Sequence, residues 1–205
     1  MAYTTYDQIN LLANIDINDI PNATITSIIA EATKELNRMI NTRVVRERVE
    51  YIDSTRENKL DGSNTIFYVK NWKGKFLADS DNDGSVGTSD VIVYQVSSDG
   101  TETKPTISAI DVDDCYVTLS SAPTAGVLLY ITYEWCFKNQ STPDPLIKLA
   151  CTLLSTAYCY AKLNVDMAPQ QGPKNSYEHY YKRFLNIVRQ INNEMPTFLE
   201  SEETF

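Results

Sequence analysis

Catalytic residue types and motifs are scarce in this sequence. Its 205 residues include a single histidine, His179. The nucleotide-binding, hydrolase and metalloprotease motifs G-x-G-x-x-G, P-loop, G-x-S-x-G and H-E-x-x-H do not occur. Carboxylate pairs such as Asp113-Asp114 lie in expected turns or in the tail, where charged side chains are usually solvated. The sequence therefore predicts a protein that is not an enzyme, with His179 on a surface or at an interface.

Long apolar runs are also missing. No stretch reaches the roughly 18 apolar residues that a membrane-spanning helix needs, so no membrane association is expected. The opening residues 1–7 lack a basic region followed by an apolar one, which predicts no signal peptide. The four cysteines show no metal-type C-x-x-C spacing. We expect reduced thiols packed as small hydrophobes in a protein made in a cytoplasm.

Basic residues are outnumbered. Against 27 Asp and Glu there are 18 Lys and Arg, which gives a formal net charge of −9. A basic footprint for phosphate is absent, so sequence-general binding of DNA or RNA is not expected. The acidity suits a soluble subunit, and it also suits a partner with basic patches or a bound cation.

Helical periodicity marks both ends of the chain. Thr5 followed by Gln8 forms a capping box at the start of a short helix that reaches about Asn14. A second helix, capped by Asn22 or Thr24, carries an apolar stripe at spacings of three and four. After residue 142, a broad apolar face predicts a central buried helix, and a final amphipathic helix ends before Pro196. The two C-terminal helices carry several tyrosines, which suit a core or a subunit interface.

Strand-like segments fill the middle of the chain. They are short, rich in β-branched residues and separated by Asp-Gly and similar turns. The predicted strands are Val45–Ile52, Thr65–Val69, Lys75–Ala78, Val91–Val96, Thr106–Val112, Tyr116–Leu119 and Val127–Trp135.

These patterns predict an α+β fold. A small helical bundle, built from residues 1–44 and 139–195, is interrupted by an inserted antiparallel β barrel or sandwich over residues 45–138. Residues 196–205 form an acidic tail, for which an extension that orders on a neighbouring subunit and a frayed terminus remain equally open.

One loop carries metal-binding chemistry. Asp79, Asp81, Asp83 and Asp90 occupy positions one, three, five and twelve of the spacing used by twelve-residue calcium loops, with Gly84 at position six. Calcium prefers several hard oxygen ligands, and alternate side chains of a tight loop converge on one point. The carbonyl of Ser85 would add a neutral ligand. We therefore predict a structural Ca²⁺ site.

Two departures from the EF-hand pattern matter. Position twelve is aspartate rather than glutamate, and the flanking segments resemble strands rather than helices. The alternative is an acidic hairpin loop with an Asp-Gly turn and no ion. Uncompensated repulsion between three alternating aspartates disfavours that alternative.

The order of segments resembles the head–tail connector (adaptor) family of tailed viruses. Four stretches carry the resemblance. They are Tyr3–Ile20 for a short first helix and turn, Ile25–Asn37 for a long second helix, Thr118–Tyr133 for a closing strand pair, and Asp144–Leu163 for the next long helix. Together they are spread from Tyr3 to Leu163, over most of the length of the chain, although none is a sharp signature. The β insertion and the acidic loop exceed the minimal family pattern.

The resemblance implies a structural protein of the virion neck, assembled in the host cytoplasm. It would form a homo-oligomeric ring, a dodecamer, that docks a portal protein on one side and a tail or stopper (head-completion) protein on the other. DNA would pass through the lumen without specific binding. The alternative is a calcium-dependent extracellular binding module of the dockerin or adhesin type, which a signal peptide or a duplicated loop would favour. The sequence contains no second copy of the loop, and no signal peptide is expected.

Overall fold

The computed structural model describes residues 3–15, 17–166 and 174–192. They form two compact units. Residues 41–144 make the β unit, and the segments before residue 41 and after residue 144 make the helical unit. The tail predicted at residues 196–205 lies outside the described residues, as does the middle of the loop expected between the last two helices.

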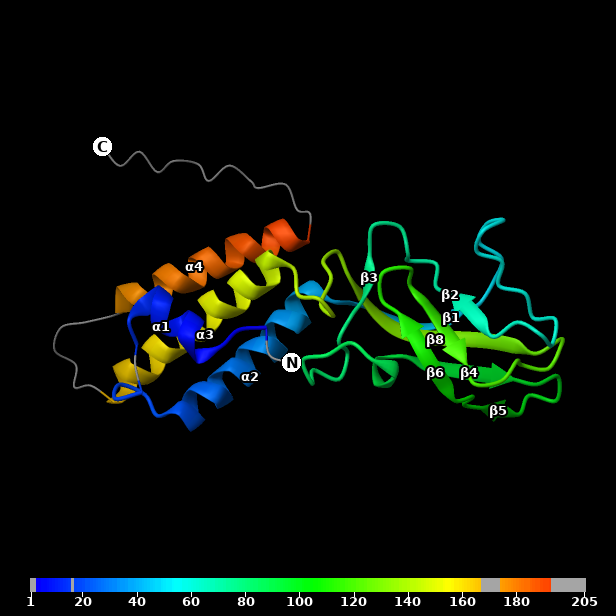
Figure 1. The fold of residues 1–205 in the computed structure, drawn as a ribbon, viewed down its shortest axis with the longest axis horizontal. Helices are drawn as coiled ribbons and strands as arrows, with labels where there is room; N and C mark the ends of the chain where they lie inside the picture. Colours follow the sequence, from blue (N-terminus) through cyan, green and yellow to red (C-terminus); the bar gives the residue numbers. More distant parts are fainter. Residues whose placement is uncertain (1–2, 16, 167–173, 193–205) are drawn as a thin grey trace. The chain divides into compact units, whose positions relative to one another are not determined.

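The helical unit contains four helices, coloured blue and yellow to red in Figure 1. They are α1 (Tyr6–Ala13), α2 (Asn22–Ile40), α3 (Pro145–Asp166) and α4 (Lys174–Ile191). The predicted capping box starts α1: the Gln8 N–H donates to Thr5 Oγ1, and the Thr5 N–H donates to Gln8 Oε1. This exchange satisfies backbone donors that the first turn of a helix leaves without partners.

Helix α3 is the central element of the helical unit. It runs between α2 and α4 and also packs against α1 (Figure 1). Its residues 150–157 are all buried, as expected of a helix that is apolar around much of its circumference. The prediction of a central buried helix after residue 142 is thus confirmed.

The β unit contains two antiparallel sheets. Its strands are β1 (Thr42–Arg48), β2 (Ile66–Tyr68), β3 (Phe76–Leu77), β4 (Ile92–Val96), β5 (Glu102–Thr103), β6 (Ile107–Asp111), β7 (Tyr116–Leu119) and β8 (Leu128–Cys136). One sheet has the order β1-β8-β4-β5, with β3 also paired to β8, and the other has the order β2-β7-β6.

Strand β8 organises the larger sheet, because β1 pairs along one edge while β4 and β3 pair along the other. The β1–β8 ladder is interrupted between Val44 and Glu47. Within this bulge Arg46 adopts a left-handed φ of 53° and donates its N–H to Thr132 Oγ1. A bulge of this kind bends the strand and increases its twist.

A single core lies between the two sheets. Phe67 of β2 and Val117 of β7 are buried with Leu129, Ile131 and Tyr133 of β8. The sheets remain separate and do not close, so the structure contradicts the barrel alternative. No hydrogen-bonded ladder among the described strands joins one sheet to the other, as a closed barrel would require. The α+β class itself is confirmed.

Candidate metal centre

The acidic loop joins β3 to β4 and begins on a firmly held backbone. The Asp79 N–H donates to Gln140 Oε1 at 2.7 Å, and the Asp79 carbonyl accepts from Asn41 Nδ2 at 2.9 Å. Gln140 Nε2 in turn donates to Asn41 Oδ1, and Asn41 Nδ2 also donates to Glu134 Oε2. Two side chains distant in sequence therefore fix the first residue of the loop.

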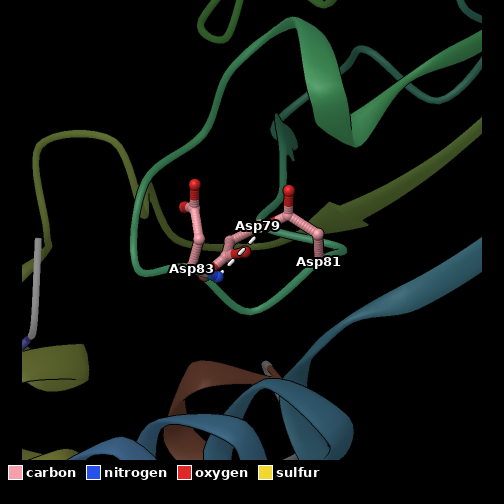
Figure 2. A group of neighbouring side chains, drawn as sticks. All are labelled: Asp79, Asp81 and Asp83. Carbon is pink, nitrogen blue, oxygen red and sulfur yellow. Dashed lines mark hydrogen bonds between the residues drawn. The ribbon is translucent and has the colours of Figure 1, made fainter.

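Three of the predicted ligands come together. One carboxylate oxygen from each of Asp79, Asp81 and Asp83 lies within 4.8 Å of the others. In Figure 2 the Asp81 and Asp83 carboxylates extend to the same side of the loop, with Asp79 between them. Asp79 is buried, whereas Asp81 and Asp83 are exposed, so the group has a closed base and an open mouth.

Backbone geometry produces this convergence. Asn82 and Gly84 both adopt left-handed φ angles, 62° and 84°, and such residues turn the chain sharply. The Gly84 N–H donates to Asp79 Oδ2 at 2.9 Å, which ties loop position six back to position one. The Asp83 N–H donates to Asp81 Oδ1 at 3.0 Å, drawn as a dashed line in Figure 2.

Asp83 is held through its own turn. Its Oδ1 accepts from both the hydroxyl and the N–H of Ser85. These two hydrogen bonds, of which the one from the hydroxyl has the larger effect, lower the pKa of the Asp83 carboxyl. The carboxyl is therefore ionised at neutral pH. The Ser85 hydroxyl thus donates to Asp83. The metal ligand predicted from Ser85 is a different atom, its carbonyl oxygen.

The structure places Asp90 differently from the other three aspartates. Its Oδ1 accepts from the N–H groups of Ser80 and Asp81, and its Oδ2 accepts from the N–H of Gly87. Burial raises the pKa of Asp90, against the effect of these donors. Asp90 closes the loop and does not join the group of three carboxylates.

The donor set fits a hard cation. Three carboxylates provide oxygen ligands, and the second oxygens of Asp81 and Asp83 make no hydrogen bond within the described residues. Ca²⁺ takes six to eight oxygens at loose geometry, so water would complete the shell at the open mouth. The hydrogen bond from the Gly84 N–H to Asp79 is one of the contacts that hold the loop in this shape.

Sequence patterns identified the aspartates but missed their supports. Asn41, Gln140 and Glu134 are separated by many residues from the loop, and no local spacing links them to it. Of the three, only Gln140 is buried, at 1% exposed, and a buried amide must find hydrogen-bond partners.

The other chemically notable side chains form no second site. His179 is exposed and meets the Tyr180 ring edge-on, which confirms the surface prediction. The four cysteines are buried and none forms a disulfide. Burial raises the pKa of Cys115 to about 12 and that of Cys136, Cys151 and Cys159 to about 11, so these thiols are poor nucleophiles.

No protein-family model matches this chain, and no curated protein is significantly similar to it. Among the described residues, no helix combines the length and the apolar character that crossing a membrane requires.

Proposed function

We propose that this chain is a non-enzymatic structural subunit of the tailed-virus head–tail connector type. The observation that carries the proposal is the packing of helices from both chain ends into one unit, with α3 at its centre, while residues 41–144 form a β unit of their own. The resemblance to the connector family rests on this order of segments. In this proposal the helical unit is the bundle and the β unit is the inserted module.

The proposed partners follow from the same assignment. Subunits assemble in the host cytoplasm and form a ring, a dodecamer, in the virion neck. The ring contacts a portal protein and a tail or stopper protein. The net charge of −9 supports a lumen that lets DNA slide past without holding it.

Binding to a portal ring tests this proposal. The purified chain, mixed with the portal protein of the same genome, is expected to decorate one end of the ring in electron micrographs. Antibody against the chain is expected to label virion necks. The connector role would be rejected if the antibody labelled capsid faces or tail tips. It would also be rejected if the chain did not bind the portal.

A second function is favoured by the acidic loop. We propose that Asp79, Asp81 and Asp83 bind one structural Ca²⁺, with the Ser85 carbonyl, and that Asp90 supports the ion by closing the loop. The ion would join β3 to β4 and relieve repulsion between the carboxylates. If calcium instead controls partner binding by a monomer, the chain is a calcium-dependent binding module.

Calorimetry with two matched variants tests the calcium site. Asp61 accepts from the hydroxyl and the N–H of Ser63, the same pattern that Asp83 makes with Ser85, but Asp61 belongs to no carboxylate group in the described chain. Asp83→Asn is expected to weaken Ca²⁺ binding about tenfold or more, and Asp61→Asn to leave it unchanged. Equal effects, or no heat of binding with the wild type, would reject the site.

A further inference from the structure

Helix α3 borders two apolar surfaces within the helical unit. The first, which we call the leucine surface, is formed by Leu11 and Leu12 of α1 with Lys148 and Leu149 of α3 around a hollow of about 290 Å³. Leu11 is 89% exposed and Leu149 is 37% exposed. A leucine this exposed contributes nothing to the core of its own subunit.

The second surface is a groove between α2 and α3 with a volume of about 480 Å³. Ile28, Tyr158 and Ala161 provide its apolar lining, and two exposed charged side chains, Glu31 and Lys162, also line it. Lys162 already has an interaction within its own chain. Burial raises the pKa of Tyr158 to about 12, so its hydroxyl remains a hydrogen-bond donor at neutral pH. We call this second surface the tyrosine groove.

The two surfaces face different directions. Leu149 and Ala161 are separated by twelve positions of one helix, which corresponds to about 120° around the axis and about 18 Å along it. In a two-fold dimer that joined the two surfaces, each copy would have to cover both surfaces of the other at once. Their different directions prevent this. A contact that joins them is heterologous, and repeated heterologous contacts generate rings when the rotation closes.

We propose that the leucine surface of one copy docks into the tyrosine groove of the next, with Lys148 of the first facing Glu31 of the second. This inference rests on the proposed connector function and supplies the contact by which its subunits form a ring. The side chains are complementary, because protruding leucines meet an apolar groove and a cation meets an anion. Neither Lys148 nor Glu31 has an ion-pair partner within the described residues.

A leucine substitution with a matched control tests the apolar half of the contact. Ile17 is also exposed on the helical unit, at 57%, but lies outside both surfaces. In sedimentation velocity, Leu11→Glu is expected to weaken self-association about tenfold or more, and Ile17→Glu to leave it unchanged. Equal behaviour of the two variants overturns the proposal, as does a wild type that stays monomeric at its highest soluble concentration.

A charge exchange tests the direction of the contact. Lys148→Glu and Glu31→Lys place like charges together, so each variant alone is expected to associate more weakly than the wild type. An equimolar mixture of the two restores opposite charges at every interface and is expected to recover association. A mixture no stronger than its components overturns the proposed pairing.

The same variants separate this inference from the connector role. Self-association that depends on Leu11, by a chain that ignores the portal, supports the contact and rejects the connector. Portal decoration by Leu11→Glu as complete as that by the wild type rejects the contact and supports the connector.

Discussion

Two buried polar side chains, one from each unit, differ in how they are satisfied. In the β unit, Asn58 is 8% exposed and fully engaged: its Nδ2 donates to the carbonyls of Glu50 and Tyr68, and its Oδ1 accepts from the Tyr68 N–H. In the helical unit, Thr156 is 0% exposed, and its hydroxyl has no partner within the described residues.

The difference reflects where backbone groups find their partners. Short strands separated by irregular segments leave N–H and C=O groups that side chains must satisfy. Helices satisfy their own backbone groups, so no backbone group of α3 depends on the Thr156 hydroxyl. The Asn58 side chain therefore holds backbone segments of the β unit together, whereas the buried Thr156 hydroxyl is a tolerated cost.

Substitutions that create a cavity in either core are expected to have the largest effects on stability. Phe67 in the β unit and Phe184 in the helical unit are both fully buried. Replacing either by alanine is expected to cost about 3–5 kcal/mol of unfolding free energy. Hydrogen exchange should show loss of protection in the unit that carries the substitution. Ile66→Ala, on the partly exposed neighbour of Phe67, is the control and should cost far less.

Removal of the Asn58 amide tests whether the β unit depends on its polar side chains. Asn58→Ala leaves three backbone groups without partners and is expected to cost about 2–4 kcal/mol in urea unfolding. Asn64 makes the same type of contact with the N–H and C=O of Ile66, but it is more exposed. Because water can replace it, Asn64→Ala should cost about 1 kcal/mol or less. Equal costs would contradict the argument.

Removing the hydroxyls of two threonines on α3 is expected to change stability in opposite directions. Thr156→Val removes the unpartnered hydroxyl and is expected to stabilise the helical unit by about 1 kcal/mol. The hydroxyl of Thr152 donates to the Lys148 carbonyl and lies 2.7 Å from Thr4 Oγ1. Thr152→Val should therefore destabilise by a similar amount. Thermal melts of both variants against the wild type measure the difference.

The smallest effect concerns an exposed turn. Hydrogen bonds from the N–H and hydroxyl of Ser63 lower the pKa of Asp61 from 3.8 to about 2. Because the folded value is lowered, the stabilisation is complete above 3.8 and disappears as the pH falls towards 2. Carbon-detected NMR titration should show Asp61 titrating below ordinary aspartates, and Ser63→Ala should raise its pKa. An unchanged titration in the variant would contradict this assignment.

Local sequence rules predicted much of this fold. The capping box at Thr5, the apolar stripes of α2 and α3, and all strands except β5 follow from spacing and turn residues. Strand β5 has only two exposed residues and no apolar pattern to reveal it. The convergence of Asp79, Asp81 and Asp83 was also predictable, because alternate residues of a tight loop share one side.

Features that depend on tertiary contact were not predictable in this way. The position of Asp90 depends on three N–H groups that only the closed loop brings together. The support from Asn41 and Gln140 requires distant segments to meet. Whether the sheets close depends on strand lengths, which sequence patterns locate only to within a few residues.

The bulge in β1 has a consequence for handling at high concentration. A seven-residue outer strand offers its unpaired backbone groups as a template for strands of other molecules. With Arg46 turned into the left-handed region, that template is broken near its middle. Strands of other molecules would find no continuous row of unpaired backbone groups to pair with, which disfavours amyloid-like stacking in concentrated solution.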